Sequence, residues 1–366
     1  MILNNTKPCI NMNRSTSLLT RKNEYETIQV TRFICALVVM ILHTAFYTSE
    51  RLDSKTFHYD QGFQGVKLFF IISGFVMIIS SESLMGNQKA WSIFAIKRII
   101  RIVPIYWIMT TYKLIILIFA SSLIYHARLD YGFILKSYFF IPAFNVDGSL
   151  EPFYGVGWTL NYEMFFYLLF TVALLVRVRP IVFMSIILIP LSVLSIYRTS
   201  NWPAAVSFYA NPIILNFLYG MIAGQLIING KKLSQRLAIP LIVICLLYIF
   251  IPRIGIISGI PSNNVIVSIA SFLLIYGAAS IENFWGKKIP AQLIYLGGAS
   301  YSLYLIHPSV APLAPTLLNL LHLKFDVLSV VLGVLGAILV GTTFYKFCEK
   351  PLTKFLSNCA RKFNLI

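Results

Sequence analysis

Long apolar runs recur along this sequence, and they leave few folds open to it. Each run is about 17–22 residues long, which is the length that an α-helix needs to cross a bilayer. The runs are continuous rather than alternating, which argues against a transmembrane β-barrel. Only 12% of the residues are charged, about half the fraction of soluble domains. The sequence therefore predicts an all-α, polytopic membrane protein.

The apolar runs predict ten membrane-spanning helices, with ends uncertain by several residues. They are 29–48, 63–81, 102–124, 153–176, 180–197, 212–229, 237–252, 264–280, 292–313 and 327–345. The segment 131–152 contains Phe139-Phe140-Ile141-Pro142 and can dip into the membrane without crossing it. We find no internal repeat or linker, so we expect one domain over residues 1–366.

The placement of the basic residues predicts the topology. The net charge is +17, but the excess follows the positive-inside rule rather than a nucleic-acid-binding pattern. With ten spans, loops on the side of the termini carry 20 Lys and Arg residues, and the opposite loops carry 7. We therefore expect cytoplasmic tails at 1–27 and 349–366, a helical core at 28–348, and no nucleic-acid partner.

His43, Glu163 and His307 lie inside predicted spans, where an ionisable side chain marks a functional site by default. His43 has the ordinary titration range of a general base, although it can also be a hydrogen-bonded structural residue. Arg32 precedes His43 by eleven residues, which places both on one helix face about 16 Å apart in depth. Arg32 can also snorkel to lipid phosphate.

The other two ionisable residues are expected in the same outer half of the membrane as His43. Glu163 either forms an ion pair with Lys67 or Lys113, or orients His43 and shares its proton. Tyr304 and His307 share one helix face, which serves packing or a site. These candidates lack the spacing of known zinc motifs, so we expect no metal.

A basic segment, Lys97-Arg98-Ile99-Ile100-Arg101, closes the predicted loop before the third span. If this segment is helical, Arg98 and Arg101 are neighbours on one face. Two converging guanidinium groups bind phosphate well. The alternative is a positive-inside anchor beside the interfacial pair Tyr106 and Trp107.

Six motifs spread over residues 28–352 are similar to those of the acyltransferase-3 family of integral membrane proteins. The motifs are Ile28-Gln29-Val30-Thr31-Arg32 ending in His43, Gly65-Val66-Lys67-Leu68-Phe69-Phe70 with Ser73-Gly74-Phe75, Arg98-Ile-Ile-Arg101-Ile-Val-Pro104-Ile-Tyr106-Trp107, Trp158-Thr-Leu-Asn161-Tyr-Glu163-Met-Phe-Phe166-Tyr167, Ser300-Tyr301-Ser-Leu-Tyr304-Leu-Ile-His307-Pro308 and Glu349-Lys350-Pro351-Leu352. Within the family, the sequence most resembles bacterial exopolysaccharide acetyltransferases of the succinoglycan type. Gln29 and Lys67 stand where many members have Asp, so no carboxylate role carries over to position 67.

The resemblance implies a bacterial inner-membrane O-acyltransferase with ten helices. The implied co-substrate is an acyl-CoA, with acetyl-CoA as the leading candidate, bound from the cytoplasm by Arg98 and Arg101. Arg32 is the arginine of the family's Arg-x10-His pair, and we expect it to contact the same donor deeper in the membrane than Arg98 and Arg101. The acceptor is a hydroxyl of a cell-surface polysaccharide or of its lipid-linked precursor.

Combining the resemblance with the residues, we expect His43 as the base with Glu163 as its partner. Tyr304, His307 and Lys67 are candidates for acceptor binding, and Tyr304 or His307 for oxyanion stabilisation. A flippase or exporter of a lipid-linked sugar is the alternative, because buried His, Glu and Lys also mark transport routes. The absence of two related halves counts against it.

Overall fold

The computed structural model describes residues 25–53, 64–121, 128–250 and 264–366, and every regular element in these ranges is helical. The predicted tail residues 1–24 and the predicted span ends at 63, 122–124 and 251–252 lie outside the described residues.

Within those ranges the chain forms long apolar helices joined by short helical turns. The helices are α2 (Glu26–Leu52), α3 (Gln64–Ser81), α4 (Ala90–Phe119), α5 (Tyr131–Tyr138), α6 (Trp158–Leu175), α7 (Pro180–Leu194), α8 (Ala204–Tyr209), α9 (Leu215–Ile228), α10 (Gln235–Phe250), α11 (Asn264–Ser280), α12 (Glu282–Trp285), α13 (Ala291–Gly298), α14 (Ser300–Val310), α15 (Leu313–Leu320), α16 (Asp326–Phe344) and α17 (Lys350–Lys362). A π-helical turn, Tyr345–Glu349, joins α16 to α17.

The helix lengths confirm a multi-pass membrane protein. In the described part of the chain, six helical segments are long and apolar enough to cross a bilayer. The number rises to seven if α11 and the segment Glu282–Lys288, bent by 49°, form one span. Each of the ten predicted spans contains a helix, and the ninth is divided at Ala299 into α13 and α14.

Helix α4 differs most from the sequence prediction. We expected a loop up to residue 101, but α4 begins at Ala90 and continues through Pro104. Arg98 and Arg101 are therefore helical residues rather than loop residues. A hydropathy pattern places a helix end where charge begins, whereas the backbone hydrogen bonds continue past charged side chains that reach a polar cavity.

Two glycine contacts set the distance between α3 and α9. A Cβ atom on Gly74 would lie 2.1 Å from the Phe217 carbonyl oxygen, and one on Gly220 would lie 1.9 Å from the Ile71 oxygen. Small residues allow such close backbone approach in membrane helices. Gly297 also permits close packing, because its Cβ would lie 2.2 Å from the Gln29 oxygen of α2.

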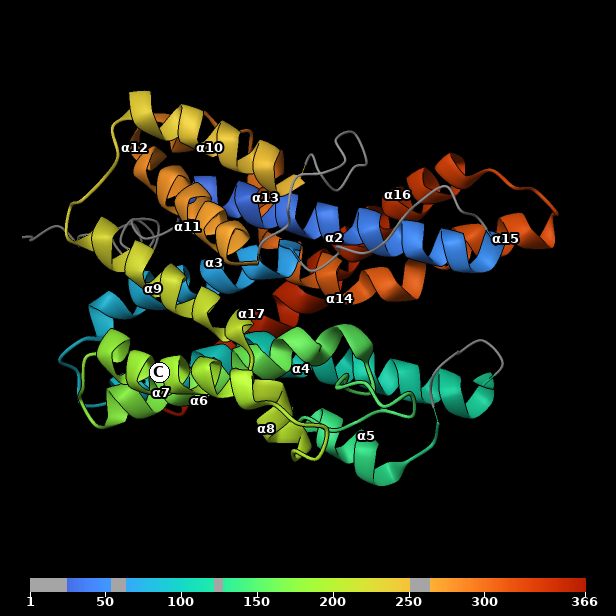
Figure 1. Ribbon diagram of the computed structural model, residues 1–366, viewed down its shortest axis with the longest axis horizontal. Helices are drawn as coiled ribbons and strands as arrows, with labels where there is room; N and C mark the ends of the chain where they lie inside the picture. The colour runs from blue at the N-terminus through green and yellow to red at the C-terminus, as the bar shows by residue number, and fades with distance from the viewer. Residues whose placement is uncertain (1–24, 54–63, 122–127, 251–263) are drawn as a thin grey trace, which may run out of the picture.

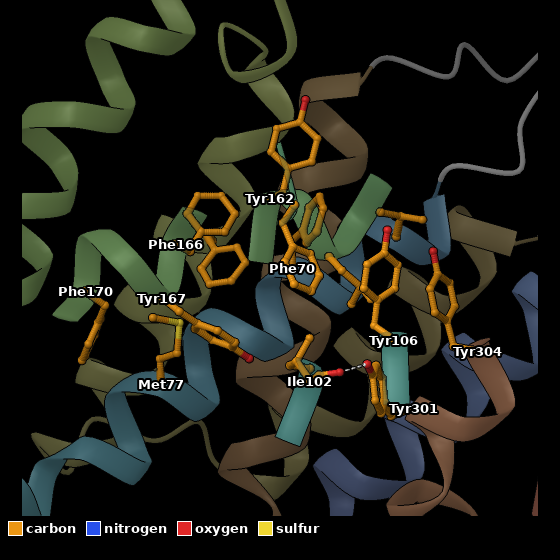
Figure 2. Close-up of a cluster of buried hydrophobic side chains, with 14 of the residues drawn as sticks. Phe70, Met77, Ile102, Tyr106, Tyr162, Phe166, Tyr167, Phe170, Tyr301 and Tyr304 are labelled. Carbon is orange, nitrogen blue, oxygen red and sulfur yellow. Dashed lines mark hydrogen bonds between the residues drawn. The ribbon is translucent and has the colours of Figure 1, made fainter. Parts of the chain in front are cut away.

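The long helices run along the longest axis of the molecule. Figure 1 shows α2 above and α4 below, with α14 between them, and α14 contacts both. A cluster of buried aromatic side chains joins α3, α6 and α9. Figure 2 shows Phe70, Tyr162 and Phe166 within this cluster, and Phe166 lies 3.5 Å from Phe217 between ring centroids. This rigid block supports one side of the candidate site.

Candidate active site

A cavity of about 350 Å³ lies among α2, α3, α4, α6 and α14. Its size falls in the range of small-molecule binding sites. Three basic side chains line it, Arg32, Arg98 and Arg101, together with the carboxylate of Glu163. The predicted donor-binding arginines therefore meet in one cavity, and its basic excess suits an anionic ligand.

The Arg98 guanidinium is held in a fixed orientation. Its Nη2 atom donates to the Ser80 hydroxyl at 2.6 Å. The same group lies 5.1 Å from the centre of the Phe94 ring and 5.4 Å from that of Tyr167. Arginine stacks on aromatic faces and keeps its remaining N–H groups available for a planar anion.

Glu163 lies with these arginines rather than with His43. Its Oε1 atom accepts hydrogen bonds from the Tyr167 hydroxyl and, at 3.2 Å, from the Ser73 hydroxyl. The two lysines considered as its partners lie elsewhere. Lys67 donates to the Asn264 side chain at 2.7 Å, and the Lys113 ammonium lies 5.2 Å from the centre of the Phe153 ring.

His43 and His307 form a pair between α2 and α14. His43 Nδ1 lies 3.2 Å from His307 Nε2, and the ring centroids are 4.9 Å apart. His307 Nδ1 lies 3.3 Å from the Leu303 carbonyl oxygen, and the His307 side chain has no exposed surface. The structure thus gives His43 a histidine partner 264 positions away.

We assign the tautomers of both rings from these contacts. A carbonyl oxygen only accepts, so His307 Nδ1 carries a proton. A second proton would leave a buried charge, because the ring nitrogens of His307 contact the Leu303 carbonyl and His43 rather than a carboxylate, so we assign His307 as neutral with a lone pair on Nε2. His43 Nδ1 must then donate to that lone pair, and His43 Nε2 is left as a hydrogen-bond and proton acceptor.

Tyr304 stands between the cavity and the histidine pair. Its ring centroid lies 5.8 Å from that of His307. Its hydroxyl donates to the Val156 carbonyl at 2.9 Å and accepts from Thr159 at 3.0 Å. Because the hydroxyl proton is already engaged, Tyr304 serves as a wall of the cavity rather than as a free oxyanion donor.

Polar groups continue along α2 on the other side of His43. Tyr47 and Arg51 follow at one-turn intervals, and Arg51 Nη1 donates to Thr316 of α15 at 2.7 Å. Glu151, in the loop before α6, interacts electrostatically with Tyr47, and burial raises the pKa of Glu151. Hydroxyl, guanidinium and carboxyl groups therefore flank the histidine pair at this end.

Several site residues were not predicted as such. Tyr167 follows Glu163 by one helical turn, and this spacing is a signal that the sequence contained. Ser80 follows Ser73 by two turns on the same face of α3, so this spacing could also have identified it from the sequence. Phe69 lines the cavity but has no pattern that separates it from a packing residue. Within the described ranges, no group of three or more His, Cys, Asp or Glu residues is placed to hold a metal ion.

The chain is similar in sequence to known proteins. Residues 25–346 match a family described as an acyltransferase domain. The chain is 30% identical over 318 residues to the exopolysaccharide production protein ExoZ of Rhizobium meliloti (strain 1021), which covers 86% of this chain and 95% of ExoZ. It is 24% identical over 331 residues to the putative peptidoglycan O-acetyltransferase YrhL of Bacillus subtilis (strain 168), covering 80% of this chain and 50% of YrhL. No solved structure matches the chain significantly.

Proposed function

Because the chain belongs to the acyltransferase-3 family and is a membrane-bound acyltransferase, we propose that it acetylates a surface glycan. In this proposal acetyl-CoA is the donor, and the acceptor is a hydroxyl of a polysaccharide or its lipid-linked precursor. The names of the two relatives support a carbohydrate acceptor and O-acetyl transfer. The topology proposed with it is ten crossings of the bacterial inner membrane by a single domain over 1–366, with both termini in the cytoplasm.

The donor is proposed to enter the cavity at the level of Arg98 and Arg101. Under the proposed topology this is the cytoplasmic side, since the basic N-terminal turns of α4 lie there. Coenzyme A carries several phosphate charges, and two guanidinium groups that line one cavity bind such charges through charge-assisted hydrogen bonds. Arg32, which lines the same cavity from α2, adds a third positive group deeper in.

Glu163 is proposed as a positioning residue of this donor site. Tyr167 donates to its carboxylate, and the ring of Tyr167 in turn lies over the Arg98 guanidinium. The Glu163 carboxylate therefore holds the Tyr167 ring in place, and that ring holds the Arg98 guanidinium in place for phosphate binding. This assignment replaces direct contact between Glu163 and His43, since Glu163 accepts hydrogen bonds from Ser73 and Tyr167.

His43 is proposed as the general base. Its Nε2 accepts the proton of the sugar hydroxyl as the oxygen attacks the thioester carbonyl carbon. When the C–S bond breaks, the proton passes from Nε2 to the thiolate, giving free coenzyme A and the O-acyl sugar. The Nδ1–H bond to His307 keeps Nε2 unprotonated before the reaction and stabilises the imidazolium after it.

The observation that carries this proposal is the histidine pair, with its proton-accepting nitrogen fixed by contacts to α14. The test is His43→Ala in membranes from an expressing bacterium, supplied with labelled acetyl-CoA. A general base contributes about 10²–10⁴-fold in rate, so label entering the glycan should fall by that factor. His322→Asn, at an exposed histidine in a left-handed turn, is the matched control and should keep parent activity.

Two outcomes would count against the proposal. Acetyl transfer by His43→Ala at the parent level would remove His43 from the mechanism. Export of glycan without any label in the parent membranes would favour the transport alternative.

A further inference from the structure

An aromatic contact lies at one end of the donor cavity. At this end, where α3 and α6 begin, the lining residues include Phe69, Thr159 and Tyr304. The rings of Phe69 and Tyr304 touch, with centroids 5.8 Å apart and planes inclined by 61°. Among the residues that the structure describes, neither His43 nor His307 belongs to the cavity lining. Tyr304 lines the cavity and its ring also lies 5.8 Å from that of His307, so the contact adjoins both the donor cavity and the histidine pair.

The two rings are held very differently. Tyr304 is anchored at its hydroxyl by Val156 and Thr159 and is 7% exposed. Phe69 is only partly buried, and it lies at the junction of three separate groups of buried apolar side chains. A phenyl ring has no polar group to anchor it, and side-chain rotations are fast compared with turnover. Phe69 is therefore the ring that can turn aside while Tyr304 stays in place.

We propose that Phe69, closing against Tyr304, is a gate between the donor cavity and the histidine pair, and that it limits the enzyme to short acyl groups. This inference rests on the proposed function, because a gate matters only if an acyl group must travel from the cavity to His43. The thioester end of the donor passes when the Phe69 ring turns, and the turned ring leaves room for a two-carbon group. A longer chain has to share the opening with the ring and is admitted less readily.

Before the donor end passes, the closed gate also keeps water on the acceptor side away from the thioester in the cavity. If it stays open, water replaces the sugar hydroxyl as the attacking group. The C–S bond then breaks with hydroxide oxygen added to the acyl carbon, giving a free carboxylic acid and coenzyme A thiol. The gate therefore controls two measurable quantities, the acyl-length preference and the ratio of hydrolysis to transfer.

The experiment compares acetyl-, propionyl- and butyryl-CoA, each labelled in the acyl group, in membranes that carry the full-length protein and their own glycan. Label in the glycan measures transfer, and label released as free acid measures hydrolysis. One methylene in a tight apolar site changes selectivity by about 10- to 200-fold. With Phe69→Ala, the butyryl-to-acetyl ratio should rise at least tenfold, and hydrolysis should rise with it.

A second variant and a control keep the test decisive. Phe69→Trp narrows the opening and should slow acetyl transfer at least tenfold without changing the dissociation constant of acetyl-CoA. Val76→Ala enlarges the same cavity from the same helix, two turns from Phe69, and should leave the acyl-length profile unchanged.

The outcomes separate the gate from the function it serves. Parent turnover combined with an unchanged acyl-length profile in Phe69→Ala overturns the gate alone. An equal change in Val76→Ala also overturns it, because cavity volume would then explain the effect. A parent protein that transfers no acyl label from any donor contradicts the proposed function itself.

Discussion

Replacing His307 with leucine removes the acceptor that the structure gives to the Nδ1–H group of His43. The expected consequence is a change in which His43 nitrogen carries the proton. In the parent, the wrong tautomer would place two lone pairs face to face across 3.2 Å and lose the hydrogen bond. In His307→Leu this preference disappears, and an Nδ1–H group would face an apolar side chain.

The size of the effect follows from that hydrogen bond. Leaving a buried donor unsatisfied costs about 1–3 kcal/mol, which corresponds to about a 5- to 150-fold fall in kcat. The full contribution of a general base, about 10²–10⁴-fold, is the upper limit. KM for the acyl-CoA donor should stay unchanged, because His307 does not line the donor cavity.

Steady-state acyl transfer in membranes measures both constants. His307→Gln is the rescue variant, since its amide oxygen can accept the same Nδ1–H bond, and we expect its kcat within about tenfold of the parent. Equal losses in the leucine and glutamine variants would refute the tautomer argument, because a packing role alone would not distinguish them. A rise in KM with constant kcat would instead make His307 a substrate-binding residue.

Two further predictions concern the donor site and the helix packing. Arg98→Ala or Arg101→Ala should raise KM for the donor by about 10- to 150-fold, because a hydrogen bond to a charged group contributes about 1.5–3 kcal/mol. Arg98→Lys should recover little of the lost donor affinity, since lysine lacks the planar guanidinium group of arginine. An unchanged KM in these variants would mean that the donor phosphates bind elsewhere. Gly220→Ala should destabilise the protein by about 1–3 kcal/mol, because its Cβ would lie 1.9 Å from the Ile71 carbonyl oxygen. The midpoint temperature of heat-induced aggregation of the purified protein measures this loss of stability. Gly336→Ala is the control, because its Cβ would lie 3.4 Å from its nearest neighbour. Equal midpoints in the two variants would contradict the packing argument.

The apolar runs were enough to predict where most helices lie. Run length depends only on local hydropathy, and each predicted span contains a helix. The start of α4 at Ala90 was missed because its first turns carry Lys97, Arg98 and Arg101, which a hydropathy pattern interprets as a loop. The π-helical turn Tyr345–Glu349 has no sequence signal that we recognise.

The sequence indicated which residues could carry chemistry, but it did not indicate which of them contact one another. The sequence singled out His43, His307 and Glu163 as costly groups in a membrane. Which of them meet depends on how each helix is rotated about its axis and at what height it crosses its neighbours. Those quantities follow from contacts such as Gly74 and Gly220 against facing backbones, which link residues far apart in the chain.

The glycine contacts between α3 and α9 have a consequence for motion. Backbone already contacts backbone there, so the two helices cannot move closer together, and no flexible side chains lie at these contacts to change conformation. The α3 flank of the cavity is accordingly stiff, and any widening that a bulky ligand needs falls to α4, which lines the cavity with Arg98, Arg101 and Ile102.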